Sequence, residues 1–176
     1  MKLVAALLVV LILIVAGAAI VIESGVYDVG TGHHDNTLVN WVLDTAKTRS
    51  VQHHARGIPV PSLEDTSLID LGFREYRPCG NCHGAPGRPP GPIAKGLWPE
   101  APDLAKTADE WTTAELYWII RNGLKFTSMP AWGPTHDERR LWALTAFVRK
   151  LPHLSAAEYQ AMLDRAGMEG PGSRRP

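Results

Sequence analysis

The sequence predicts an all-α protein in which a few helices follow a single N-terminal transmembrane helix. Three observations lead to this fold class. Apolar residues recur at intervals of three and four residues in several segments, as they do on one face of a helix. Three segments open with Ser or Thr followed three residues later by Glu, the pattern of a helix-capping box. No segment shows the convincing apolar–polar alternation of a half-buried strand.

The N-terminal segment is long and apolar enough to cross a membrane. Leu3 to Ile22 form an unbroken run of apolar or small residues between Lys2 and Glu23. A helix of this length spans about 30 Å, the thickness of the bilayer core, and Lys2 favours a cytoplasmic N-terminus. A signal peptide cleaved at Ala16-Gly17-Ala18 is the alternative, but the apolar run continues past that site. Both interpretations place the rest of the chain outside the cytoplasm.

Two further helices are predicted ahead of the first cysteine. Apolar residues recur at helical spacing through Asn36–His54, and the prolines of Ile58-Pro59-Val60-Pro61 end that helix. A shorter helix is predicted from about Asp65 to Arg77. Gly72 inside it lowers helix stability, so either a second helix approaches closely at this point or the glycine is merely tolerated.

Capping boxes predict the helices of the C-terminal half. The helix that begins at Thr112 is closed by Asn122-Gly123, and the helix that begins at Thr135 is closed by Pro152. The helix that begins at Ser155 is short. Six prolines and four glycines between Gly84 and Pro102 predict a long loop, and the tail from Met168 is predicted to be disordered. The capping pairs are Thr112 with Glu115, Thr135 with Glu138, and Ser155 with Glu158.

The sequence Cys79-Gly80-Asn81-Cys82-His83 has the C-x-x-C-H pattern that attaches a c-type haem. Two thiols at this spacing can each add across one vinyl group of the porphyrin and form a thioether bond. His83 is then placed under the iron as the proximal ligand. The motif therefore predicts one covalently attached haem c, and attachment requires reduced cysteines on the outer face of a membrane.

Other uses of a C-x-x-C sequence remain open. A thioredoxin-like redox pair expects a βαβ context that the flanks do not provide. The chain has two cysteines, which excludes a zinc site of four thiolates. A site of two cysteines and two histidines is conceivable, but it leaves His83 unexplained. The histidines open to such a site are otherwise expected to be exposed and incidental: His33, His34, His53 and His54.

The candidate for the second axial ligand is Met129. It precedes Pro130 in a predicted loop, where an extended backbone suits the presentation of a side chain inward. Filling of a gap in the core is the alternative. Of the other methionines, Met1 begins the apolar run, Met162 lies at helical spacing in a packing position, and Met168 lies in the tail. Ligation by His83 and Met129 leaves the iron no open site, which favours electron transfer over catalysis.

Several short motifs around the cysteines occur in the order found in one protein family. They are Gly72, Tyr76, Cys79–His83, Pro102-Asp103-Leu104, Met129-Pro130-Ala131-Trp132 and Leu141–Val148. From about Leu68 to Leu151 the chain thereby resembles a class I c-type cytochrome of the bacterial, single-haem kind. The resemblance implies a cytochrome c fold, in which a few helices wrap one covalently bound haem. It also implies that the helix before the haem motif crosses the C-terminal helix, with Gly72 against Leu144–Val148.

Four parts of the chain are expected. They are a transmembrane anchor (1–23), a linker with a juxtamembrane helix (24–61), the haem domain (62–153), and a C-terminal helix with a flexible tail (154–176). Trp98 and Trp132 are candidate donors to a haem propionate, with core packing as the equal alternative. Weaker candidates are Arg49 for a propionate, and Lys95, Lys106 and Lys125 for steering an acidic partner.

Charge and motifs together predict the class of function. Lys+Arg and Asp+Glu are equal at 18 each, which argues against nucleic acid as a partner. The expectation is a cytochrome anchored in the bacterial inner membrane with its haem domain in the periplasm. Its donor would be a quinol-oxidising complex or a dehydrogenase, and its acceptor an oxidase, a reductase or a photosynthetic reaction centre. The alternatives are a permanent haem subunit of a larger complex, and a haem enzyme or gas sensor with an open iron site.

Overall fold

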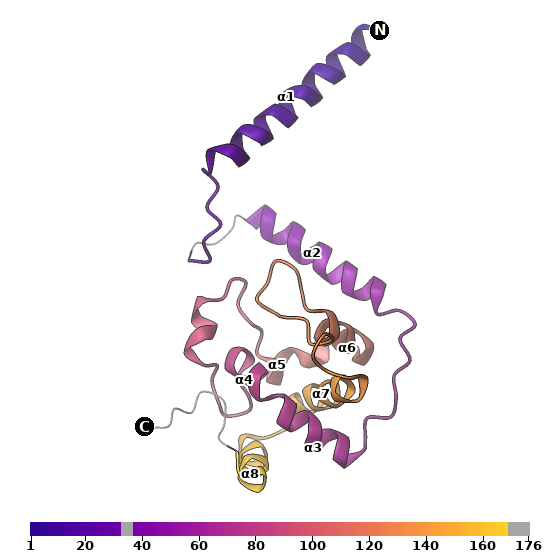
Figure 1. Cartoon of the computed structure of the whole chain (residues 1–176), viewed down its shortest axis with the longest axis vertical. Coiled ribbons are helices and arrows are strands. Elements are labelled where there is room, and N and C mark those ends of the chain that lie inside the picture. The colour runs from indigo at the N-terminus through magenta and orange to yellow at the C-terminus, as the bar shows by residue number, and fades with distance from the viewer. Residues whose placement is uncertain (33–36, 169–176) are drawn as a thin grey trace. The chain divides into compact units, whose positions relative to one another are not determined.

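Regular structure in this protein is helical, as the computed structural model shows for residues 1–32 and 37–168 (Figure 1). The prediction of an all-α fold is confirmed for this part of the chain. Contacts between residues divide the chain into two compact units, residues 1–34 and residues 35–176. The second unit contains every helix after the first.

The first unit is built on helix α1 (Lys2–Ser24), whose residues are all exposed. Gly25 ends the helix in the left-handed region with a φ of 63°, a conformation that glycine adopts without strain. By length and composition, α1 is the one helix of the described residues that could cross a membrane. A signal sequence near the N-terminus has the same properties.

Helix α2 (Thr37–His54) begins the second unit and packs through its C-terminal half on α6 (Thr113–Asn122). Val51 of α2 is completely buried. The ring of His54 stacks on that of Trp118 from α6, with 5.6 Å between the ring centres and 9° between the planes. The predicted helix over 36–54 is therefore present, and its first residue, Asn36, lies outside the described residues.

The helix predicted from about Asp65 to Arg77 is α3 (Thr66–Glu75), and the haem motif that follows it forms a separate short helix, α4 (Arg77–His83). Asp65 caps α3 by accepting a hydrogen bond of 2.8 Å from the backbone N–H of Ser67. The chain divides at Tyr76, shortly before Pro78, which has no backbone N–H to continue the hydrogen bonds of α3. As a result, both cysteines and His83 lie on the short helix α4.

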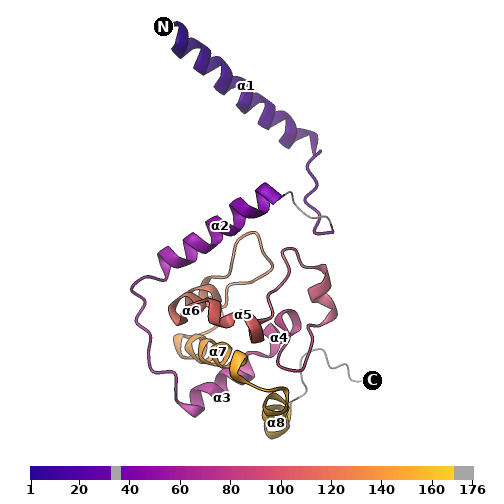
Figure 2. The same cartoon turned by 180° about the vertical axis from the view of Figure 1, so that it is seen from behind.

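Helix α3 crosses α7 (Glu138–Lys150) at Gly72 (Figures 1 and 2). A Cβ atom added to Gly72 would collide with the carbonyl oxygen of Ala143 and lie 2.8 Å from the Cβ of Phe147. Rings also meet across the crossing, since Phe73 and Phe147 stand edge to face at 5.5 Å. The expected crossing is therefore confirmed, and the close approach of the helices explains the glycine.

Two of the three predicted capping boxes are confirmed. Thr112 caps α6 reciprocally with Glu115, and Ser155 caps α8 (Ala156–Ala166) reciprocally with Glu158. The prediction that Thr135 caps α7 is wrong. Asp137 is the cap, and its carboxylate accepts a hydrogen bond of 2.8 Å from the N–H of Arg140. The hydroxyl of Thr135 instead donates to a carbonyl oxygen of the preceding turn.

Four short elements in the connections were not predicted. Three are 3-10 helices: η1 (Pro92–Gly96) inside the predicted long loop, η2 (Ala108–Glu110), and η3 (Leu151–His153) after α7. The fourth is the short helix α5 (Leu104–Thr107). Segments of this length bury too few residues to show a period in the sequence.

Helix α8 belongs to the core of the second unit. Tyr159 is 2 % exposed and stands edge to face against Phe73 at 5.7 Å. Met162 is 8 % exposed among core residues, which agrees with its predicted packing role. Of the tail predicted to be disordered, Met168 packs against this core, and residues 169–176 lie outside the described part of the chain.

Candidate haem-binding site

Helix α4 holds three of the four predicted site residues. Cys79 and Cys82 are three positions apart and therefore lie on the same side of the helix. Cys79 and His83 are each 9 % exposed, and Cys82 is half-buried. The helix ends at Gly84, which adopts a φ of 67°. The carbonyl oxygen of Gly84 accepts a hydrogen bond of 2.8 Å from the hydroxyl of the fully buried Tyr76, which fixes the end of the motif.

The surroundings of the cysteines do not resemble a thioredoxin-like pair or a zinc site. Burial raises the pKa of Cys79 to about 12, whereas a redox-active thiol has a lowered pKa. The described residues contain no strand for a βαβ unit and no group of three or more His, Cys, Asp or Glu residues that could hold a metal ion. His53 and His54 are exposed, and His33 and His34 lie outside the described residues.

The ring of His83 is held by a backbone carbonyl. Its Nδ1 lies 2.8 Å from the carbonyl oxygen of Pro102, and a carbonyl only accepts, so Nδ1 carries the proton. Burial lowers the pKa of His83, with the hydrogen bond to Pro102 opposing it. A neutral ring in this tautomer leaves the lone pair on Nε2, the atom that can bind a metal. The geometry therefore leaves the Nε2 of His83 as the ring atom that could bind a metal.

The carbonyl of Pro102 is itself positioned by the start of α5. Asp103 caps this helix, and its Oδ1 accepts a hydrogen bond of 3.1 Å from the N–H of Ala105. Lys106 forms an exposed ion pair of 2.8 Å with the other carboxylate oxygen of Asp103. The sequence marked Pro102-Asp103-Leu104 as a motif but gave it no role. The structure shows that this motif orients the ring of His83.

The loop after the motif folds back against α4. The N–H of Gly91 donates to the carbonyl oxygen of Asn81, the middle of the motif, at 2.8 Å. Ala85 and Arg88 exchange two backbone hydrogen bonds of 2.9 and 2.8 Å in a tight turn. A Cβ on Gly84 would lie 2.9 Å from the carbonyl oxygen of Arg88, so the turn also needs a glycine at this position. Hydrogen bonds therefore hold the backbone of the motif both at Asn81, between the cysteines, and at Gly84, where the helix ends.

Met129 lies half-buried in the loop between α6 and α7. The N–H of Met129 donates to the hydroxyl of Thr127 at 3.0 Å, and this hydroxyl donates to the carbonyl oxygen of Leu124 at 2.8 Å. The carbonyl oxygen of Met129 accepts from the N–H of Leu124 at 3.2 Å. Sequence reasoning missed Thr127, although a hydroxyl two residues before the methionine is a usual sign of a local side chain to backbone bond.

Gly123 fixes this loop against the end of α6. Its φ is 66°, and a Cβ there would lie 2.8 Å from the carbonyl oxygen of Met129 and 2.6 Å from the nitrogen of Ala131. Further along the loop, the N–H of Trp132 donates to the carbonyl oxygen of Ile120 at 3.1 Å. The backbone of Met129 is thus held at both sides, on a different element from the cysteines and His83.

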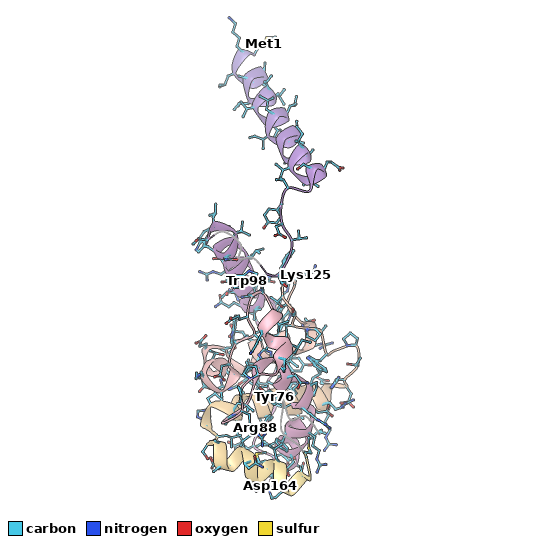
Figure 3. All side chains as sticks on the ribbon, turned by 90° about the vertical axis from the view of Figure 1, so that its left-hand side faces the viewer. Met1, Tyr76, Arg88, Trp98, Lys125 and Asp164 are labelled. Carbon is cyan, nitrogen blue, oxygen red and sulfur yellow. The ribbon has the colours of Figure 1, made fainter. Side chains whose placement is uncertain are left out.

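A buried donor near this loop lacks a partner. The indole nitrogen Nε1 of Trp132 is buried and makes no hydrogen bond within the described residues. Such a group costs about 1–3 kcal/mol unless it is paired, and a porphyrin carries propionate carboxylates that accept hydrogen bonds. Trp98 is half-buried and lies at the same end of the second unit as Lys125, opposite Asp164 (Figure 3). Of the two tryptophans, Trp132 therefore has the stronger case as a propionate donor.

The residues present fit a c-type haem. Cys79 and Cys82 would form the two thioether bonds, and the Nε2 of His83 and the thioether of Met129 are the ligand types that hold haem iron in electron-transfer cytochromes. The unpaired indole N–H of Trp132 fits an anionic propionate. The same donor set does not suit a hard cation, which prefers oxygen ligands.

A half-buried ion pair joins α3, α7 and the segment that carries Trp132. Glu75 is 17 % exposed and receives two hydrogen bonds of 2.9 Å from Arg140. The Nε2 of His136 lies 3.2 Å from the same carboxylate, and the ring of His136 stands edge-on to Trp132 at 5.1 Å. No sequence pattern indicates this network, because its partners are more than 60 residues apart.

We expect Glu75→Gln to lower the free energy of unfolding by about 1 kcal/mol at neutral pH. The hydrogen bond from Arg140 is the largest influence on Glu75 and holds its pKa below the ordinary value of 4.5, while burial opposes it. A carboxyl with a lowered pKa adds stability that is complete above its unfolded pKa and is lost as the pH falls through its folded pKa. The difference between variant and wild type should therefore shrink as the pH falls below 4.5.

Urea unfolding of both proteins over a pH series measures this difference. Glu100→Gln is the matched control, since Glu100 is exposed, and it should leave the stability unchanged at each pH. A deficit of Glu75→Gln that stayed constant down to low pH would contradict the assigned role.

The remaining weak candidates are surface residues. Arg49 is exposed, and its guanidinium lies 3.5 Å from the side-chain oxygen of Gln52 on the same helix. Lys95 on η1 and Lys125 in the loop of Met129 are exposed as well.

One comparison with known proteins found a match that covers this region. A family model described as "Cytochrome C oxidase, cbb3-type, subunit III" matches residues 73–148. The match begins in α3 and ends in α7, so it includes the C-x-x-C-H motif, the carbonyl that orients His83, and the loop of Met129. A search of curated proteins found no match to the chain. Residues 73–148 therefore form a class I c-type cytochrome domain, a domain of the kind that carries one covalently bound haem c.

Proposed function

We propose that this chain is a membrane-tethered periplasmic cytochrome c that carries one electron at a time between redox complexes. The observation that carries the proposal is the state of His83 next to the two cysteines. His83 is buried, its Nδ1 donates to the carbonyl oxygen of Pro102, and its Nε2 carries the lone pair. In this proposal the domain organisation is that expected from the sequence, with an anchor over 1–23 and a haem domain over 62–153.

Each site residue has a separate role in this proposal. Cys79 and Cys82 attach the porphyrin, His83 is the proximal ligand, and Met129 is the distal ligand. When bound, the haem supplies a one-electron couple between ferric and ferrous iron. A thioether ligand from Met129 together with the imidazole of His83 would favour the ferrous state and so raise the reduction potential. With both axial positions taken by protein side chains, no position is left for a substrate, which supports electron transfer as the function.

The location follows from the N-terminal helix and from the chemistry of attachment. An uncleaved α1 would span the inner membrane with Lys2 on the cytoplasmic side. The haem domain would then lie in the periplasm, where the haem is attached. A tether confines the carrier near membrane-bound partners and raises its effective concentration there. The donor would be a quinol-oxidising complex or a dehydrogenase, and the acceptor an oxidase, a reductase or a reaction centre.

Met129→Ala is expected to abolish the weak charge-transfer absorption, at the red end of the visible spectrum, that marks methionine bound to ferric haem. The substitution removes the thioether while Thr127 and Gly123 still hold the loop backbone. Absorbance spectra of the oxidised protein measure the band, and redox titration should show a lowered reduction potential.

Met162→Ala is the matched control for this experiment. Met162 packs in the core on α8, so its removal is expected to cost about 2–5 kcal/mol of stability but to leave the band in place. Persistence of the band in Met129→Ala, or its loss in Met162→Ala alone, would refute Met129 as the ligand.

A second candidate function is a permanent haem subunit of a larger membrane oxidoreductase. The family model that matches residues 73–148 is described as a subunit of an oxidase, and this description favours the candidate. Solubilisation of native membranes in a mild detergent, followed by sizing, separates the two functions. A stoichiometric large complex supports the subunit, and a species of the size of one chain in its detergent micelle supports the carrier.

A further inference from the structure

Helix α2 has two opposite faces, and both carry apolar residues. The inner face contains Leu43 and Val51, of which Val51 is completely buried against the rest of the second unit. At 100° per residue, Leu38, Trp41 and Val42 lie on the opposite face. Their side chains are 66 %, 63 % and 48 % exposed. The outer face of a surface helix is normally polar, so three large apolar residues within five positions indicate an additional contact.

The same outer face becomes polar and basic further along the helix. Thr45 and Arg49 follow Trp41 and Val42 at helical spacing and are both exposed. Asp44 is the acidic residue of α2, lies off this face, and is paired with Lys47 at 2.6 Å. The outer stripe is therefore defined as Leu38, Trp41, Val42, Thr45 and Arg49. It combines apolar side chains, an indole and a cation, Arg49, that has no acidic partner among the described residues.

The length of the chain limits what this stripe can reach. Helix α1 ends at Ser24 and α2 begins at Thr37, so twelve residues join them. Twelve residues span at most about 40 Å even when fully extended. If α1 crosses a membrane, the first turns of α2 cannot be farther than this from the membrane surface. The apolar residues of the stripe are nearer in the sequence to the linker than Thr45 and Arg49 are.

The chemistry of the stripe matches the headgroup region of a bilayer. Tryptophan is enriched at the boundary between headgroups and acyl chains. A basic side chain next to an apolar strip is attracted by anionic lipid. Because the anchor would supply a high effective concentration of lipid surface, even a weak interfacial contact would be occupied.

We propose that the outer stripe of α2 lies in the headgroup region of the membrane and holds the haem domain against the lipid surface. This inference rests on the proposed membrane tether. It adds an orientation to that tether, because α6 packs on the inner face of α2 and would be turned away from the lipid together with the haem domain. Electron-transfer partners would then approach from the sides that α2 leaves free.

The test uses the full, haem-loaded chain reconstituted in vesicles of phosphatidylcholine and phosphatidylglycerol. Cys79 and Cys82 are consumed in thioethers in this form, so an introduced cysteine is the free thiol for a nitroxide spin label. Thr45→Cys places the label on the outer stripe. Ser50→Cys is the matched control, since Ser50 is exposed on the same helix but lies off the stripe.

Electron paramagnetic resonance power saturation measures collisions of each label with oxygen, which concentrates in lipid, and with a water-soluble nickel complex. The ratio of oxygen to nickel collisions is expected to be severalfold greater at position 45 than at position 50. A combined Leu38→Gln, Trp41→Gln and Val42→Thr change should bring the two ratios together. Equal ratios in the unchanged stripe would overturn the proposal. Lowered collisions with both reagents at position 45 would also overturn it, because they indicate a protein partner such as a second copy.

Flotation of the vesicles after an alkaline wash separates this inference from the tether. A chain that stays with the vesicles but gives equal ratios refutes the lipid contact of α2 and leaves the tether standing. A chain that is washed off refutes the tether, and the orientation of α2 with it.

Discussion

The double variant Cys79→Ala, Cys82→Ala is expected to contain no covalently bound haem. Its denatured chain should show no peroxidase-type haem staining after acid–acetone extraction, whereas the wild-type chain keeps its stain. The reason is that these are the two cysteines of the chain, so no other thiol can form a thioether. His83 and Met129 could still bind the iron in the folded state, but axial bonds are released when the chain is denatured.

The single variants are the controls for this result. Each retains one thiol on α4, three positions from the replaced one, and so one thioether bond remains possible. Both single variants should therefore keep a stain that the double variant loses. Staining of the denatured double variant at the wild-type level would show that the haem is attached elsewhere.

Gly72→Ala is expected to destabilise the haem domain by about 1–3 kcal/mol. Alanine favours a helix over glycine by about 1 kcal/mol, so the substitution would be stabilising on an isolated helix. At this position, however, the new Cβ would collide with the carbonyl oxygen of Ala143 and approach Phe147 to 2.8 Å. Both neighbours belong to the buried face of α7, so α3 and α7 must separate. The packing loss should therefore exceed the gain in propensity.

Denaturant unfolding of the haem-loaded protein measures this loss. Gly96→Ala is the matched control, since a Cβ on Gly96 would meet no atom within 4 Å and its φ is not in the left-handed region. The control should change the stability by less than about 0.5 kcal/mol. If Gly72→Ala unfolded at the same denaturant concentration as the wild type, the close crossing of α3 and α7 would be contradicted.

Local interactions made much of this fold predictable. The capping boxes at Thr112 and Ser155 join residues three positions apart, so their pattern is complete within the sequence. The same rule failed at Thr135, because Asp137 lies two residues later and its carboxylate caps α7 instead. The side chains of Thr135 and Asp137 compete for the capping position. The sequence does not show that the hydroxyl of Thr135 instead bonds to the preceding turn.

Long-range contacts made the rest of the site unpredictable. His83 and Pro102 are 19 residues apart, and the sequence does not reveal that one carbonyl orients the ring. Glu75 and Arg140 are 65 residues apart and meet only because α3 crosses α7. The hydrogen bond from the fully buried Tyr76 to the carbonyl oxygen of Gly84 is likewise not visible in the sequence. Periodicity detects which residues face a core but not which backbone atom each polar group reaches.

Mass spectrometry of the wild-type tryptic peptide that spans residues 75–95 tests the central claim most directly, since trypsin does not cut the Arg77–Pro78 and Arg88–Pro89 bonds. This peptide contains Cys79, Cys82 and His83. Addition of a thiol across a vinyl group loses no atoms, so we expect the peptide to weigh the sum of its own mass and one haem. A peptide at its unmodified mass, or one lighter by the two hydrogen atoms lost in a disulfide, would contradict a haem bound covalently through both cysteines.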